Sequence, residues 1–167
     1  MKTLKSELTT IMNFIPNDSY CLYSNELKEL SLRYEEEEVA KECYKLDRND
    51  ATLLYLLAIA GNKKSEKYLR LSLENNEDGD GSTIRIALGF IALNIEEGFQ
   101  IIEQLLNKTY PTKFNEFLED VYAYLLHVIH ISPRALKMLE DIENGKYGDA
   151  SFIISYVEEK KRRLNEK

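Results

Sequence analysis

The chain has 167 residues and a formal charge of −7; 31% of its residues are charged and 44% belong to the hydrophobic set. This balance excludes a disordered chain, and the length suits one domain. The excess of acid disfavours a protein that coats a nucleic-acid backbone and favours one that meets a basic protein surface.

Three features of the sequence predict a cytoplasmic protein. Cys21 and Cys43 are isolated, without a CxxC pair, which indicates two reduced thiols. The N-terminal segment has Glu7 inside its apolar run and no small-residue cleavage site before Pro16, which is unlike a secretion signal. The longest uncharged segment, 121–133, is shorter than the ~20 apolar residues of a membrane span, so we expect no membrane contact.

The N-terminal region is expected to be helical. Apolar residues at helical spacing predict a first helix that ends at the Pro-Asn-Asp segment 16–18. Ser24 or Asn25 is the expected N-cap of a second helical segment. The apolar stripe of that segment loses its phase near Glu35, which predicts a break there.

The densest acidic run is Glu35 to Glu38, followed by Glu42. Pairs such as Glu37 with Lys41 predict a solvated helix face. A partner-binding patch and a metal cluster are the alternative interpretations of the same carboxylates.

The middle of the chain repeats one pattern, an apolar helix, a polar turn and an amphipathic second helix. It occurs in residues 51–75, 82–107 and 117–145, and an offset of 32 separates the turn residues Asn62 and Asn94. In the third segment we expect Ser132 as N-cap and Pro133 at the first helical position. Helical hairpins of nearly equal period are expected to stack, each covering its neighbour's apolar face.

We therefore predict an all-α fold, a right-handed stack of helical hairpins with about eight to nine helices in one domain. Residues 1–49 would form N-terminal helices, residues 50–145 three helix pairs, and residues 146–167 a C-terminal capping helix.

The capping helix contains the run EEKKRR, residues 158–163. Glu158 with Arg162, and Glu159 with Arg163, are expected i,i+4 pairs, so the basic residues are assigned to helix stabilisation.

The repeats resemble known α-solenoid families. TIRIALGFIAL with EEGFQIIEQLL is similar to a HEAT-like repeat, with Arg85 near its start and Gly89 at a close packing position. LDRNDATLLYLLAIA with SEKYLRLSLE is instead similar to a tetratricopeptide hairpin. The tetratricopeptide tryptophan and the HEAT proline are missing, so the resemblance implies the architecture and leaves the repeat family open.

One segment has the spacing of a calcium loop. Asn76, Asp78, Asp80 and Gly81 match the opening of an EF-hand, but its twelfth position is Ala87, where a bidentate glutamate is needed. A turn between hairpins is the favoured interpretation, and a calcium site is the alternative.

His127 and His130 are the only histidines and lie three residues apart on an expected helix. With Glu119 and Asp120, or with Cys43, they could form a zinc site. No HExxH or CxxC accompanies them, so semi-buried packing is the favoured interpretation. A metal-dependent enzyme that uses the two histidines is the alternative.

The sequence contains no GxSxG elbow, P-loop, GxGxxG or papain-like cysteine context. We therefore expect no catalytic residue, no cofactor and no bound metal.

Acidic residues are frequent in the repeats. Residues 1–145 carry 16 Lys and Arg against 25 Asp and Glu. The second helices of stacked hairpins usually line the concave face, which predicts a curved acidic groove with tyrosine anchors. The candidate partner-binding residues are Glu66, Glu96, Glu97, Glu103, Glu119, Asp120, Tyr124, Glu140, Asp141 and Glu143.

A small, acidic, all-helical protein without a catalytic constellation resembles the immunity proteins of contact-dependent and polymorphic toxin systems. The resemblance implies a cognate basic toxin domain as partner, in many such systems a nuclease, whose active or substrate-binding surface is blocked. It further implies a monomer before complex formation and no direct contact with nucleic acid. A helical-repeat adaptor that holds a peptide or a host protein is the alternative.

Overall fold

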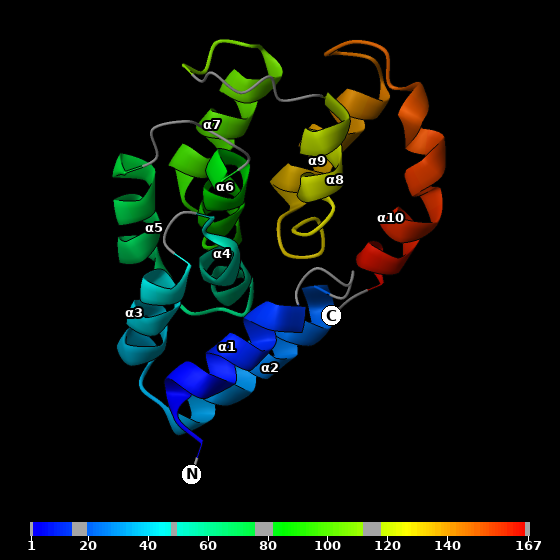
Figure 1. The fold of residues 1–167 in the computed structure, drawn as a ribbon. Coiled ribbons are helices and arrows are strands. Elements are labelled where there is room, and N and C mark those ends of the chain that lie inside the picture. The colour runs from blue at the N-terminus through cyan, green and yellow to red at the C-terminus, as the bar shows by residue number, and fades with distance from the viewer. Residues whose placement is uncertain (1, 15–19, 48–49, 76–81, 112–117, 166–167) are drawn as a thin grey trace.

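The computed structural model describes residues 2–14, 20–47, 50–75, 82–111 and 118–165, and all regular structure in these ranges is helical (Figure 1). The all-α prediction is confirmed. The described ranges contain ten α-helices and one 3-10 helix, η2. They are α1 (Leu4–Phe14), α2 (Tyr20–Arg33), α3 (Glu36–Leu46), α4 (Thr52–Ile59), α5 (Ser65–Glu74), α6 (Ser82–Ala92), α7 (Glu96–Leu106), α8 (Leu118–Leu125), α9 (Pro133–Glu143), η2 (Ser151–Tyr156) and α10 (Val157–Leu164).

The predicted count of eight to nine helices is not confirmed, because the described ranges alone contain ten α-helices. The break near Glu35 is confirmed: this residue has an extended backbone, with φ −66° and ψ 142°, and α3 begins immediately after it. Ser24 and Asn25 do not cap α2, which already begins at Tyr20. No proline or glycine lies between Tyr20 and Asn25 to stop the helix from including them.

Four helices end in the same backbone reversal. In α7, the Lys108 N–H donates to the Leu105 carbonyl at 3.2 Å and the Thr109 N–H to the Gln104 carbonyl at 2.8 Å. This pair of bonds defines a Schellman motif, which requires a left-handed residue just after the helix. The motif turns the chain within a few residues, and the predicted turns at Asn62 and Asn94 coincide with the reversals after α4 and α6. The left-handed residues after α4, α6, α7 and α9 are Gly61, Asn94, Lys108 and Gly145.

The start of α9 also follows the sequence. The Ser132 hydroxyl accepts a hydrogen bond from the Ala135 N–H at 3.1 Å, and Pro133 occupies the first helical position. Proline needs no N–H partner there, so both predicted roles are confirmed.

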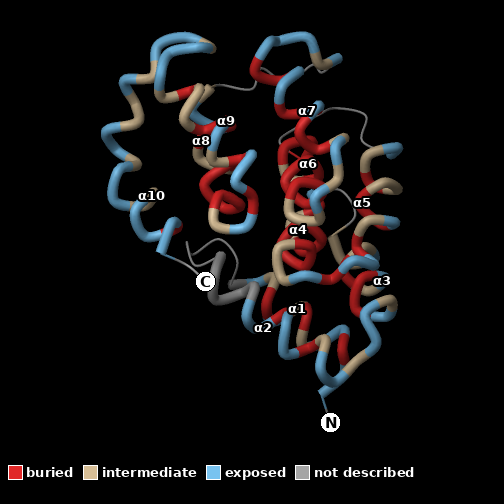
Figure 2. Tube along the Cα trace, turned by 180° about the vertical axis from the view of Figure 1, so that it is seen from behind, coloured by how far each residue is buried: buried red, intermediate tan, exposed pale blue. Residues whose placement is uncertain are grey.

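The helices pack in two rows. In one row α2 packs on α4, α4 on α6, α6 on α8, and α8 on η2. In the other row α1 packs on α3 and α3 on α5. Consecutive helices also pack across the rows, as α4 does with α5 and α6 with α7. Figure 2 shows α4 and α6 buried along most of their length, between the surrounding helices.

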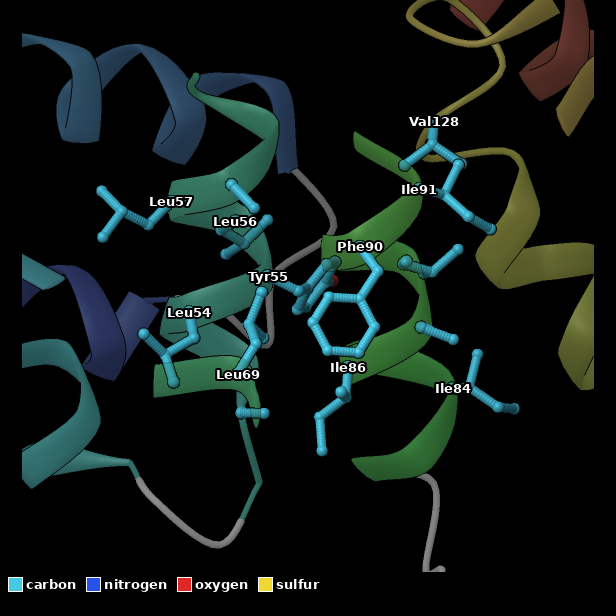
Figure 3. Packing of buried hydrophobic residues seen from close by; sticks show 14 of the residues in the cluster. Leu54, Tyr55, Leu56, Leu57, Leu69, Ile84, Ile86, Phe90, Ile91 and Val128 are labelled. Atoms are coloured by element: carbon cyan, nitrogen blue, oxygen red, sulfur yellow. The ribbon is translucent and has the colours of Figure 1, made fainter. Parts of the chain in front are cut away.

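The core is centred on these two helices because their sequences are apolar on all sides. Tyr55 of α4 lies beside Phe90 and Ile86 of α6, and Ile91 lies toward Val128, which follows α8 (Figure 3). All five side chains are buried. Full burial of each large apolar side chain contributes roughly 1.5–3 kcal/mol.

The C-terminal segment differs from the prediction of a single capping helix over 146–167. It forms η2 and then α10, with a change of helix type at Tyr156. A 3-10 helix places residues three apart on one side, and Ile153 and Tyr156 are both packed against the core. The Tyr122 ring meets Phe152 and Tyr156 edge to face, at 5.5 Å between centroids in each pair. Aromatic packing therefore favours the tighter helix here.

Candidate functional site

The acidic residues of α5 and the start of α7 are used in contacts between helices. Arg70 of α5 donates to Glu66 at 3.0 Å and to Glu97 of α7 at 2.7 Å. Its guanidinium also lies over the Phe90 ring, 5.3 Å from the centroid. Glu66 and Glu97, both predicted to bind the partner, therefore pair with the same arginine of this chain.

A second pair joins α7 to α9. Arg134 donates two hydrogen bonds to Glu96, the longer at 2.9 Å, and its guanidinium lies 4.1 Å from the centroid of the Phe99 ring. The Arg134 hydrogen bonds lower the pKa of Glu96. Glu96 is therefore a charged, engaged carboxylate.

A third pair joins α3 to α5. Glu37 accepts a hydrogen bond from the Tyr68 hydroxyl at 2.7 Å and pairs with Lys67 at 3.3 Å. The predicted pair of Glu37 with Lys41 is wrong, because the Glu37 carboxylate meets α5 instead. Together the pairs Glu37–Lys67, Glu97–Arg70 and Glu96–Arg134 form an interhelix ion-pair row that links α3, α5, α7 and α9.

The acidic residues late in α9 are engaged as well. Asp141 pairs with Lys137 at 2.9 Å and with Lys146 at 3.7 Å, and the Lys137 hydrogen bond lowers the pKa of Asp141. Glu143 accepts a hydrogen bond from the Tyr122 hydroxyl at 2.8 Å and pairs with Lys160 at 2.9 Å. Glu143 thus fastens α10 to α8 and α9.

Four predicted residues remain without an ion pair to any described residue. The end of α7, the start of α8 and the end of α9 lie at the same end of the molecule (Figure 1). We call these four residues the acidic end: Glu103, Glu119, Asp120 and Glu140. The first three are exposed and Glu140 is half-buried. Only Glu119 has a described side-chain partner, the Tyr156 hydroxyl, which donates to it at 3.0 Å.

Tyr124 has a structural contact. Its hydroxyl accepts a hydrogen bond from Arg85 of α6 at 3.0 Å, and Arg85 also donates to the Asp50 carbonyl. This links the start of α4, α6 and α8. The ring is half-buried and packs edge to face with His127.

The groove beside α5 is not acidic. This open groove has a volume of about 540 Å³, and its walls carry four cationic side chains against three carboxylates. Sequence reasoning considered the glutamates of α5 without the lysines at its start. The cations are Lys63, Lys64, Lys67 and Arg70, and the carboxylates are Glu37, Glu66 and Glu74.

The two histidines do not lie on one helix, because α8 ends at Leu125 and the chain then forms turns. His127 is buried, and its ring stacks on Tyr55 at 6.3 Å and meets Tyr124 at 5.7 Å between centroids. Burial, with the charges of Arg163 and His130, lowers the pKa of His127 to about 3. His127 is therefore a neutral packing residue at ordinary pH.

The structure describes some, but not all, of the residues in the other sites considered from the sequence. Within the described ranges, no group of three or more His, Cys, Asp or Glu side chains is arranged to hold a metal ion. Cys43 is buried, and burial raises the pKa of its thiol. The loop from Asn76 to Gly81 and the Cys21 side chain lie outside the described residues. Among the described helices, none has both the length and the apolar character that a membrane span needs.

At the C-terminus, the Glu159–Arg163 pair is confirmed at 3.4 Å. Glu158 pairs with Lys161 at 3.5 Å, one residue earlier than predicted, and Arg162 lies 3.9 Å from Glu159. Sequence reasoning missed that Arg163 is buried, at 2% exposure. Its position within a basic run had indicated a solvated side chain.

Comparison of the chain with models of known protein families, with curated proteins and with solved structures gave no match.

Proposed function

We propose that this protein is a non-enzymatic immunity protein that binds and neutralises a cognate basic toxin domain of the nuclease class. It would block the active or substrate-binding surface of that toxin. The observation that supports the proposal is the acidic end, where Glu103, Glu119, Asp120 and Glu140 lack a described cation partner while the other predicted carboxylates are paired internally. Uncompensated carboxylates attract a basic surface and speed its encounter.

The proposal includes the architecture. The two packed rows support a right-handed α-solenoid of HEAT-like or tetratricopeptide-like hairpins, with α1 and the segment 146–167 at its ends. Such a domain would be cytoplasmic and monomeric until it meets the toxin.

The predicted contact residues fall into two groups, those that already form an ion pair within the chain and those that do not. Glu66, Glu96, Glu97, Asp141 and Glu143 would have to give up an internal cation to meet a partner. The carboxylates of the acidic end would not. We therefore assign the main electrostatic contribution to the acidic end.

The test begins with affinity capture from a lysate of the source organism, washed at low and then high salt, followed by mass spectrometry. We expect one basic polypeptide, retained at near one-to-one stoichiometry, whose toxic activity the purified protein suppresses. Many weak partners that are lost with salt would instead indicate a peptide-binding adaptor.

Charge reversal then tests the acidic end. Glu103→Lys and Asp120→Lys should each slow association with the captured polypeptide and weaken its salt dependence. Glu26→Lys on α2 is the matched control, because Glu26 is also exposed and has no ion pair to a described residue. Equal slowing by all three variants would show a general charge effect and no contact at the acidic end.

A further inference from the structure

The C-terminal segment presents several large hydrophobic side chains to solvent. Five large hydrophobic side chains are exposed in the described ranges, and three belong to residues 151–164: Ile154 at 79%, Val157 at 45% and Leu164 at 45%. Their spacing of three and seven residues places them on one helical face. Arg163 is the only buried residue of the segment. Ile154 and Val157 therefore form an exposed apolar patch where η2 joins α10.

Carboxylates surround the N-terminal half of this face. Tyr156 binds Glu119 of the acidic end, and the Asp149 carboxylate accepts the Ser151 N–H at 3.1 Å. Glu158 lies one turn after Ile154, and its side chain is 89% exposed. The basic residues of α10 begin at Lys160, and Lys161 pairs with Glu158 at 3.5 Å. Ile154 and Val157 thus lie close in the chain to Asp149 and to Tyr156, which binds Glu119 of the acidic end.

We propose that this surface is the docking face for the basic partner. Ile154 and Val157 would enter an apolar pocket of the partner, while Glu119 and Asp149 would face its lysines and arginines. The inference rests on the proposed function and names the face that carries it out. The combination matches protein interfaces, in which a few central apolar anchors hold the complex and charged residues at the rim steer it.

Charge argues against a second copy of this chain as the occupant. A second copy would carry the same formal charge of −7 and the same carboxylates beside Ile154. Like charges at an interface oppose association. A cationic partner instead gains from the same carboxylates.

The decisive comparison uses two exposed apolar residues. Ile154→Ser removes an anchor, and Leu32→Ser on α2 is the matched control, because Leu32 is 86% exposed and lies far along the chain from the acidic end. The probe is the purified basic polypeptide that the wild-type protein retains at high salt. We expect Ile154→Ser to raise the dissociation constant about 10-fold or more, mainly through faster dissociation, and Leu32→Ser to leave it within about 2-fold.

The outcomes separate this inference from the proposed function. If the polypeptide binds and is suppressed equally well by wild type and Ile154→Ser, the toxin docks elsewhere and only this inference fails. If wild type retains no basic polypeptide, both fail. A wild-type dimer that Ile154→Ser converts to a monomer would show that a second copy covers the face, and this inference would then be wrong.

Discussion

Gly98 allows a close approach between α7 and α6. A Cβ atom at this position in α7 would lie 2.6 Å from the Ala87 carbonyl oxygen, 2.8 Å from the Phe90 Cβ and 2.9 Å from the Ile91 nitrogen. All three atoms belong to α6, and two are backbone atoms that no side-chain rotation can move. Gly98→Ala should therefore push α7 away from α6.

The size of the effect follows from two opposing terms. Overpacking a dense core typically costs about 1–3 kcal/mol. Alanine is better than glycine in a helix by about 1 kcal/mol, which offsets part of that loss. Because the clash involves backbone, we expect the upper part of the range and a net loss of about 1–2 kcal/mol. For a domain of this size the melting temperature should fall by about 2–4 °C for each kcal/mol.

Gly89→Ala is the matched control. Its Cβ would also be close to a neighbour, 2.7 Å from Leu69 Cδ1, but that atom is the far end of a side chain that can rotate. Gly89 also lies inside a helix, so the propensity gain is the same. We expect stability within about 0.5 kcal/mol of wild type, or higher.

Urea denaturation followed by circular dichroism at 222 nm measures both variants against wild type. The dependence of the unfolding free energy on urea concentration should be the same in all three proteins, so that a shift in the midpoint of the unfolding curve reports a change in stability alone. A Gly98→Ala protein as stable as Gly89→Ala would refute the backbone contact between α6 and α7.

Three further predictions concern single side chains. Lys108 has φ +59° at the end of α7, so Lys108→Gly should raise the free energy of unfolding by about 1 kcal/mol in the same urea assay; a loss would contradict the left-handed conformation. The folded-state pKa of His127 is lowered to about 3, below its unfolded value of ~6.5. The contribution of the neutral ring to the free energy of unfolding is therefore fully present above pH 6.5 and is lost as pH falls toward 3. Wild type should lose about 1 kcal/mol between pH 6 and pH 5, and His127→Gln should lose less; parallel pH curves would contradict the buried neutral ring. Tyr122→Phe removes the 2.8 Å hydrogen bond to Glu143 and should cost about 1 kcal/mol, with faster amide exchange in α10 as the local signature; unchanged exchange would contradict the fastening role.

Local signals in the sequence were sufficient for much of the fold. Asn94 marked a turn because asparagine tolerates the left-handed conformation, and Ser132 with Pro133 marked a helix start because each satisfies a specific backbone need. Lys108 carried no such signal, although it adopts the same left-handed conformation.

The ion pairs between different helices could not be predicted, because they depend on contacts between residues that are distant in the sequence. Glu37 had Lys41 at the right spacing on its own helix, yet it pairs with Lys67 of α5. Arg134 is 38 residues from Glu96, beyond the reach of any helical spacing rule. The apolar face at Ile154 was also hidden, because the sequence predicted one α-helix and the 3-10 turn changes which residues face outward.

The short Schellman reversals have a consequence for how the chain folds. They let α4 pack on α5 and α6 on α7 across only a few connecting residues, so these contacts are local in sequence. Domains dominated by local contacts fold quickly, because little chain entropy is lost before contacts form. During synthesis the hairpins can therefore form while later residues are still being added. Residues 151–164 are made after the hairpins, so the proposed docking face with Ile154 would be completed only after those hairpins can form.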